Sequence, residues 1–540
     1  MRKSNWNVHI NGKGTPVNEI IKKFWSSRGI QSPQAFLNPT GNIYPASYLQ
    51  NIDKAARTFN ICKNLPFPKF VIYADVDADG CSAAAILYHY LTALEIECYV
   101  YINNNKDHGV KDEFFEENRN EDCVIVVDSI NDTMEQYEKI WAQGKQLIIL
   151  DHHIPNELIL ENASALNLVS SSIDYPNPHL SGSGVTWKFV KYLDYLNGTN
   201  IADNLVDLAA VGIIADVCSV GPESMENREI CSQGFYNVQN CGIQAVVNAT
   251  ELNSESVSFS IAPLVNAANR MNENMLALSL FLSESLSEAK KITKELTKIK
   301  DTQKKLATEL FENFEAQMID QKDNSCYYFI IDDSYGNLGG LLATKASDKW
   351  KRPCIVVHER EDSFAGSMRA TGVENFSKIV NDSGLGECAG HENSAGIVIP
   401  KENFDQLKAY IESALNHLDF TPNMDVDIYI ERMQITPFLM NELKLINRIT
   451  GPGFPTVTFC IEDVKNYNVK PLSQGKHLCV ETPDMKFLSW NFTKWEDVCD
   501  EGQMSVIGTL NESFFAGKHS TQLMIHDYIF QRTPKKVSLW

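Results

Sequence analysis

The feature that most constrains this 540-residue chain is an acidic cluster placed directly after an apolar run. The run PKFVIY (68–73) is typical of a buried strand, and the stretch CSAAAILYHYL (81–91) is typical of a helix. Between them, ADVDADG carries Asp75, Asp77 and Asp79. Open α/β sheets bind ligands at the carboxyl ends of their strands, and carboxylates this close repel unless protons or a cation intervene. Because oxygen ligands suit hard cations, the sequence predicts a Mg²⁺ or Mn²⁺ site here.

A calcium-binding EF-hand loop is the alternative for such a cluster. That loop requires a glutamate at its twelfth position and a helix on each side. Counted from Asp75, the twelfth residue is Ile86, which lies inside an apolar run. The calcium alternative is therefore excluded.

The alternation of apolar strands with helical stretches from about residue 66 predicts a multidomain α/β protein with a parallel sheet. Residues 285–306 carry seven lysines against three acidic residues, with apolar residues on one helical face, so we expect a long connecting helix there. Short strand-like runs near the end of the chain are typical of a small β-barrel. The expected parts are an N-terminal helical segment (1–65), a parallel-sheet catalytic domain (66–276), the connecting helix (277–322), a second α/β domain (323–422) and the barrel (423–540).

Composition limits the classes of function. A hydrophobic content of 44% and a charged content of 22% are ordinary for a soluble protein, and neither a membrane span nor a signal peptide is evident, so we expect a cytoplasmic location. Thirteen cysteines without a CxxC pair indicate reduced thiols. The net charge of -21 opposes nucleic-acid binding, which would depend on local basic grooves and metal ions.

Further acidic residues follow other apolar runs of the catalytic domain. Asp128 follows CVIVV, Asp216 follows AAVGIIA, and LIILDHH ends in Asp151, His152 and His153. A single aspartate at such a place is typical of a helix cap or a turn. The whole set, with its histidine pair, instead favours two metal ions that share a bridging aspartate.

The order DxDxDG, Asp, DHH, Asp resembles the DHH phosphoesterase superfamily, and in particular its RecJ-type exonucleases. The resemblance extends through six further segments, with departures from the family pattern at Leu264, Asn269 and Ala389. They are GSGVTWKFV (182–190), ADVCSVGPESMENR (215–228), IAPLVNAANRM (261–271), the DHHA1-like pair AGSMRA (365–370) and CAGHENSAGIVI (388–399), and the OB-fold-like ITGPGFPTVTF (449–459). It therefore implies a DHH domain, a DHHA1 domain and an OB-fold barrel in that order.

The resemblance also implies roles for individual residues. Two Mn²⁺ or Mg²⁺ ions are expected, with Asp128 as the bridge and His153 as a catalytic donor to a phosphate oxygen. Asp79 is expected either to bind a metal or to orient a residue that does. The expected metal ligands are Asp75, Asp77, Asp79, Asp128, His152 and Asp216, and the expected substrate contacts are Arg270, Ser367, Arg369, Gly390 and His391.

The function implied is a 5′→3′ exonuclease of single-stranded DNA that acts in repair or recombination. One alternative is a DHH phosphodiesterase for short oligoribonucleotides or cyclic dinucleotides, but such relatives generally end after the DHHA1 domain. The other is a non-catalytic scaffold of the replicative-helicase branch, which the intact acidic set argues against. We expect a monomer that binds single-stranded DNA and no membrane, with a single-strand-binding protein or a helicase as candidate partners. Deletion from Asp425 onward is expected to spare the cleavage of short substrates.

Overall fold

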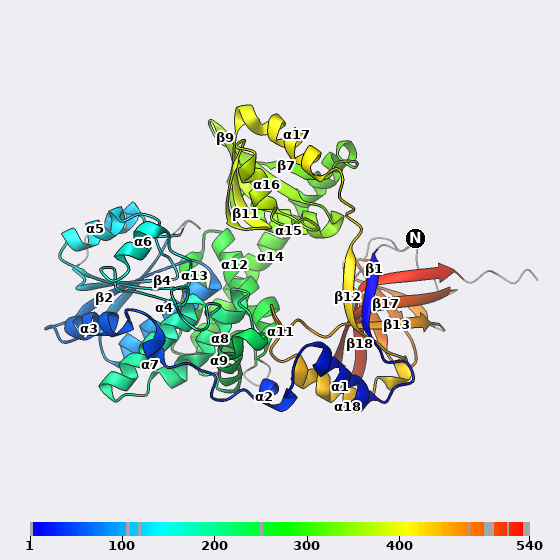
Figure 1. Cartoon of the computed structure of the whole chain (residues 1–540), viewed down its shortest axis with the longest axis horizontal. Helices are drawn as coiled ribbons and strands as arrows, with labels where there is room; N and C mark the ends of the chain where they lie inside the picture. Colours follow the sequence, from blue (N-terminus) through cyan, green and yellow to red (C-terminus); the bar gives the residue numbers. More distant parts are fainter. Residues whose placement is uncertain are drawn as a thin grey trace, which may run out of the picture.

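The structure is a computed structural model with three lobes, one around each of its three sheets (Figure 1). It describes residues 4–103, 108–116, 120–248, 252–465, 467–473, 475–490, 502–515 and 518–532, without the side chains of 514, 515, 518 and 519. Among the described helices, none is both long and apolar enough to cross a membrane.

The first lobe contains a five-stranded parallel sheet in the order β3-β2-β4-β5-β6, which confirms the expected parallel sheet. Its strands are β2 (Lys69–Ala74), β3 (Glu97–Ile102), β4 (Cys123–Val127), β5 (Gln146–Asp151) and β6 (Leu168–Ser170). The helices around it include α3 (Ile52–Lys63), α4 (Ala78–Ala93), α5 (Glu135–Ala142), α6 (Glu157–Asn162), α7 (Gly182–Asn197) and α8 (Val206–Ala215). The metal-binding segments predicted from sequence therefore follow the carboxyl ends of β2, β4 and β5.

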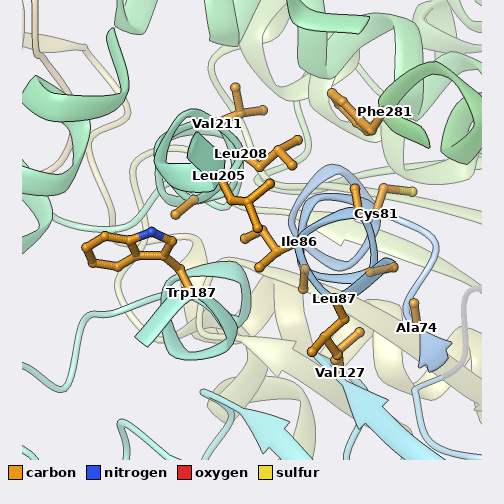
Figure 2. Close-up of a cluster of buried hydrophobic side chains, with 14 of the residues drawn as sticks. Ala74, Cys81, Ile86, Leu87, Val127, Trp187, Leu205, Leu208, Val211 and Phe281 are labelled. Carbon is orange, nitrogen blue, oxygen red and sulfur yellow. The ribbon is translucent and has the colours of Figure 1, made fainter. Parts of the chain in front are cut away.

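The core of this lobe fixes where α4 begins. Ile86 and Leu87 of α4 pack among Trp187 of α7 and Leu208 of α8, as Figure 2 shows. Because α4 is apolar along most of its length, it is covered on several sides. Its first turn is consequently held at the end of β2, where the acidic cluster lies.

Further helices lead from this lobe to the second lobe. They are α9 (Met225–Tyr236), α10 (Cys241–Val246), α11 (Ser254–Ser256), α12 (Ala262–Arg270), α13 (Asn274–Leu282) and α14 (Leu286–Gln317). The predicted long connecting helix is α14, which runs up to the second sheet in Figure 1. The Ser285 hydroxyl caps it by accepting a hydrogen bond from the Glu288 amide, 3.2 Å away.

The second lobe is an α/β unit around a mixed sheet in the order β10-β11-β9-β8-β7. β7 and β8 are parallel, whereas β8, β9, β11 and β10 pair antiparallel. Its elements are β7 (Tyr327–Ile331), α15 (Gly339–Trp350), β8 (Cys354–Glu359), β9 (Ser363–Arg369), α16 (Phe376–Asp382), β10 (Glu387–His391), β11 (Ser394–Pro400) and α17 (Phe404–Leu415).

The third lobe corrects one expectation about the N-terminus. Residues 5–11 do not belong to a helical segment, because they form β1, which pairs in parallel with β12 of the C-terminal sheet. The alternation in NWNVHIN is a two-residue period, so it fits a strand. The sheet has the order β1-β12-β13-β17-β18-β16-β15-β14. Its elements are β1 (Asn5–Asn11), α1 (Val17–Ser27), α2 (Pro33–Leu37), β12 (Asn423–Tyr429), α18 (Pro437–Ile446), β13 (Phe459–Val464), β14 (Asn468–Leu472), β15 (His477–Glu481), β16 (Lys486–Ser489), β17 (Gly502–Phe515) and β18 (Lys518–Arg532).

A buried arginine joins the first and third lobes. Arg228 of α9 is 1% exposed, and its Nε donates to the Phe36 carbonyl at 2.7 Å. Its Nη1 donates to the carbonyls of Val220 and Ile449, each 3.1 Å away. Its guanidinium also lies 3.7 Å from the centre of the Phe36 ring. One side chain therefore connects the N-terminal segment, the catalytic domain and the C-terminal lobe.

We expect Arg228→Ala to lower the free energy of unfolding by about 3 kcal/mol, because each buried carbonyl that loses its partner costs roughly 1–3 kcal/mol. Chemical unfolding followed by tryptophan fluorescence measures this change. Arg432→Ala is the control, since Arg432 makes an exposed ion pair with Asp484 and its loss should cost less than about 1 kcal/mol. Equal effects of the two substitutions would contradict the role of Arg228.

Candidate metal centre

Carboxylates from two neighbouring strand ends meet at one edge of the first sheet. Asp75 and Asp77 follow β2, Asp128 follows β4, and one ligand atom from each lies within 4.8 Å of the others. Asp77 also caps α4, because its Oδ1 accepts hydrogen bonds from the amides of Asp79 and Gly80 at 2.9 and 3.0 Å. Three oxygen donors this close form a candidate site for a divalent cation.

Two further groups of ligand atoms adjoin this one. One contains Asp79, His152 and Asp216, and the other contains Asp128, His152 and His153. His152 Nε2 lies 3.3 Å from Asp128 Oδ1 and 3.7 Å from Asp216 Oδ2. Since Asp128 and His152 each belong to two groups, the three groups form one continuous set of ligands.

Asp128 has the properties of a residue that requires a cation. It is 2% exposed, and its Oδ1 has no hydrogen-bond partner among the described residues. Its backbone lies in the left-handed region with φ +54°, which aspartate tolerates better than most residues. A Cβ at Gly182 would lie 2.6 Å from Asp128 Oδ1, so only glycine leaves room there. This buried oxygen, which accepts no hydrogen bond from the described residues, fits a bound metal ion.

The electrostatics of the site favour the same interpretation. Burial, followed by repulsion from neighbouring carboxylates, raises the pKa of Asp75 and of Asp128 well above the ordinary value. Burial and the charge of Asp79 raise the pKa of Asp216 to about 7. Divalent cations would offset both the desolvation of these groups and their mutual repulsion.

Asp79 belongs to the first turn of α4, and its carboxylate lies at the N-terminus of α7. Its Oδ2 accepts a hydrogen bond from the Gly182 amide at 2.7 Å, and its Oδ1 accepts one from the Ser183 amide at 3.1 Å. Burial raises the pKa of Asp79, which is 1% exposed. Because it also belongs to the group with His152 and Asp216, the geometry is compatible with both roles expected for Asp79.

Asp151 has a structural role that the sequence argument did not assign. Its Oδ1 accepts hydrogen bonds from the His152 amide at 2.7 Å, the His153 amide at 2.8 Å and His153 Nδ1 at 2.8 Å. Burial opposes the charge of Asp151, but the attraction of His153 outweighs it and lowers the pKa to about 2. Burial likewise opposes the charged form of His153, but Asp151 raises its pKa to about 9. Asp151 therefore orients His153 and favours its charged form. The sequence signal for this role was that Asp151 is the first residue of the DHH motif.

A second residue that the sequence argument missed is His108. Its ring centre lies 4.7 Å from that of His153, and its Nδ1 lies 3.9 Å from Asp75 Oδ2. Burial and the charge of His153 lower its pKa. A lone histidine in the loop after β3 was the only sequence signal.

The expected substrate residues of the second lobe lie on two strands of its sheet. Ser367 and Arg369 alternate along β9, so their side chains share one face. Ser394 of β11 pairs with Arg369 on one side and with His391 on the other, which places these three residues in one row. Gly390 has φ +124°, a conformation that L-residues rarely adopt.

The second lobe contacts the first lobe near the end of α12, which lies close to the metal centre. Burial and the nearby charge of Arg369 lower the pKa of Arg270, the last residue of α12. The adjacent Asn269 donates a hydrogen bond to the Val76 carbonyl, within the acidic loop itself. Asn337 Nδ2 donates to Asn272 Oδ1 at 3.0 Å, a direct link between the two lobes. The structure thus places Arg270 next to a residue that contacts the acidic loop, and within electrostatic reach of Arg369.

The fold and site define a multidomain α/β protein with a candidate divalent-metal centre at the edge of a parallel sheet. Residues 69–213 match the family model of the DHH family, N-terminal domain, and residues 426–527 match that of the RecJ OB domain. The chain is 24% identical over 489 residues to the single-stranded-DNA-specific exonuclease RecJ of Bacillus subtilis, an alignment that takes in 85% of this chain and 61% of that protein.

Two other comparisons agree. Over 467 residues the chain is 26% identical to a putative prophage-derived single-strand DNA-specific exonuclease of Bacillus subtilis, with 78% of each protein covered. The crystal structure of Thermus thermophilus RecJ with Mn²⁺ matches with a TM-score of 0.78 at 21% identity, over 99% of this chain and 81% of that one. The chain is therefore similar to RecJ proteins in sequence and in fold, and residues 69–213 match the DHH family.

We expect Asp128→Asn to raise the thermal midpoint of the metal-free protein, because it removes a buried charge and keeps a side chain suited to φ +54°. Each kcal/mol gained corresponds to about 2–4 °C. The stabilisation that Mn²⁺ gives the wild type should be lost. Thermal unfolding at pH 8, in chelator and in excess Mn²⁺, measures both effects.

Asp174→Asn is the matched control, since Asp174 is exposed and also left-handed, with φ +49°. It should leave the response to Mn²⁺ unchanged. A wild-type response to Mn²⁺ in Asp128→Asn would rule out Asp128 as a ligand.

Proposed function

We propose that this chain is a metal-dependent phosphodiesterase that removes nucleotides from the 5′ end of single-stranded DNA with two Mn²⁺ or Mg²⁺ ions. The observation that carries the proposal is the continuous ligand set in which Asp128 and His152 are each shared between two groups. A carboxylate shared between two groups of ligands could serve two adjacent ions, so we assign Asp128 as the residue that would bridge them. When bound, such ions lower the pKa of a water molecule and stabilise the attacking and leaving oxygens of a phosphodiester.

The protein residues around the ions have separate tasks. Asp75 and Asp77 would hold one ion together with Asp128, and His152 and Asp216 would hold the other. His153 is assigned as the catalytic donor, because its ring is held through Nδ1 by Asp151, which favours its charged form, and its Nε2 would then donate to a phosphate oxygen.

The substrate strand would pass between the metal centre and the second lobe. Arg270 is within electrostatic reach of Arg369, and a phosphate between them would offset their mutual repulsion. Ser367 and His391 extend this phosphate-binding face, and Gly390 allows a close approach of the backbone. The polarity of cleavage comes from the family resemblance, and no residue shows it independently.

The match to the RecJ OB domain supports a polymer rather than a cyclic dinucleotide as the substrate. The relatives named above are described as single-strand DNA exonucleases, which supports the same choice. A role in DNA repair or recombination, a cytoplasmic location, a monomeric state and a partner such as a single-strand-binding protein or a helicase remain predictions from the resemblance.

One assay tests the proposal. Linear single strands labelled at the 5′ or the 3′ end, a circular single strand, duplex DNA, RNA and a cyclic dinucleotide are each incubated with Mn²⁺, Mg²⁺ or chelator. We expect metal-dependent release of nucleotides from the 5′ end of linear single-stranded DNA, and no activity in Asp128→Ala. Efficient cleavage of the circle, or initial release from the 3′ end, would refute the exonuclease as proposed.

Arg369→Ala should weaken productive binding of the strand end, since Arg369 would hold a phosphate beside the metal centre. We expect KM for a 5′-phosphorylated oligonucleotide to rise at least about tenfold, equivalent to roughly 1.4 kcal/mol. Lys378→Ala is the control in the same lobe, because Lys378 pairs with Asp382 on the exposed side of α16. If both variants have the same KM, Arg369 does not contact the substrate.

A further inference from the structure

The loop that follows Asp216 contacts the C-terminal lobe directly. This loop, residues 217–221, begins at Val217, whose φ is +57°, and the Cys218 thiol lies 3.3 Å from Asp216 Oδ2. The Val220 amide donates to the Pro452 carbonyl at 3.0 Å, and the Ser219 hydroxyl donates to the same carbonyl at 3.2 Å. Pro452 belongs to residues 448–454, which we call the brace.

The brace is itself held against the helices of the catalytic domain. The Ser254 amide donates to the Arg448 carbonyl at 3.0 Å, and the Thr450 amide donates to the Ser254 hydroxyl at 3.0 Å. Arg448 Nη2 donates to the Phe235 carbonyl at 3.1 Å, and its guanidinium lies 3.5 Å from the centre of the Tyr236 ring. These contacts fix the N-terminal part of the brace, residues 448–450, against the helices of the catalytic domain.

On its opposite side the 217–221 loop is held by α9. Asn227 Nδ2 donates to the Ser219 carbonyl at 2.9 Å, and Arg228 Nη1 donates to the Val220 carbonyl at 3.1 Å. Both side chains are at most 1% exposed, so these hydrogen bonds are protected from water. The loop thus lies between α9 and the brace.

Two glycines mark the closest approach of the loop to the brace. A Cβ on Gly221 would lie 2.8 Å from the Gly453 Cα, and a Cβ on Gly453 would lie 2.9 Å from the Gly221 Cα. Either Cβ would also meet the side-chain oxygens of Glu223, which can rotate away. Backbone atoms at this distance cannot give way as a flexible side chain can. Any added carbon must push the two segments apart.

We propose that the brace positions the Asp216 carboxylate, so that the C-terminal lobe completes the metal centre as well as contacting nucleic acid. Asp216 ends α8, where no strand holds it, and the loop after it is fixed largely by contacts from outside the sheet. The proposal rests on the proposed function in taking Asp216 as a metal ligand. It also replaces the expectation that deletion from Asp425 spares short substrates, because that deletion removes the brace.

The test measures Mn²⁺ binding to the full chain by calorimetry, without DNA. Gly221→Ala is the main variant, because φ −76° suits alanine. Its Cβ would also meet the Glu223 carboxylate, but that is the end of a flexible exposed side chain, so the contact with the Gly453 backbone is the one that cannot give way. Gly453→Ala disturbs the same contact from the other side. We expect each to weaken the binding of one Mn²⁺ ion by about 10–100-fold, the usual effect of removing support from a ligand, and to leave the other ion nearly unchanged.

Two further variants separate positioning from general damage. Gly198→Ala matches the backbone strain of Gly453→Ala, with φ +67°, but its Cβ would meet nothing within 4 Å, so Mn²⁺ affinity should not change. Ser219→Ala removes the hydroxyl contacts to Pro452, Glu223 and the Gly221 amide without adding an atom, and should weaken the binding of the same ion in a folded protein.

A second measurement distinguishes failure of this inference from failure of the proposed function. Alkylation of Cys218, followed site by site with mass spectrometry, should be faster in Gly221→Ala than in the wild type or Gly198→Ala, whether or not metal binds. If Cys218 is alkylated faster in Gly221→Ala but neither this variant nor the wild type binds Mn²⁺, the brace positions the 217–221 loop and the metal-dependent function is refuted. Wild-type Mn²⁺ affinity and wild-type Cys218 reactivity in both Gly221→Ala and Ser219→Ala would overturn the proposal.

Discussion

The repulsion among buried carboxylates at one edge of a parallel sheet is the constraint on which the rest of the structure depends. Asp75, Asp79 and Asp128 are nearly inaccessible to water, and burial makes each of them harder to ionise. The fold offsets part of this cost with backbone amides, because Asp77 caps α4 and Asp79 accepts from the first turn of α7. Asp128 Oδ1 has no such partner among the described residues, which leaves it for a cation.

This constraint also explains why the lobes are so closely joined. Ligands that follow β2, β4 and β5 are held by the sheet itself, since parallel strands bring their carboxyl ends to one edge. Asp216 ends a helix and has no such support. Its loop is instead held between α9 and residues 448–454, and Arg228 joins both to the N-terminal segment. The buried charges at the site thus depend on contacts made by three distant parts of the chain.

The sequence predicted those parts of the site that depend on local order. Apolar runs that end in aspartate identified the ends of β2, β4 and β5, and the lysine-rich amphipathic stretch identified α14. Contacts across long separations could not be predicted: nothing in NWNVHIN indicates pairing with residues 423–429, although its two-residue period indicates a strand. The role of Asp151 could not be predicted for a different reason. Its hydrogen bond with His153 Nδ1 depends on the direction of the two side chains rather than on their spacing in the sequence.

The charges that face the candidate site show how so acidic a chain could act on a polyanion. Carboxylates gather on the strand ends of one lobe, while Arg270 lies within electrostatic reach of Arg369 in spite of their mutual repulsion. Each cluster alone is unfavourable, since each contains like charges in a partly buried place. Divalent cations would neutralise the first cluster, and a phosphate between the arginines would neutralise the second. A metal-bound phosphodiester would neutralise the carboxylate cluster and the arginine pair together. The net charge of -21 therefore opposes nucleic-acid binding elsewhere on the surface far more than at this site.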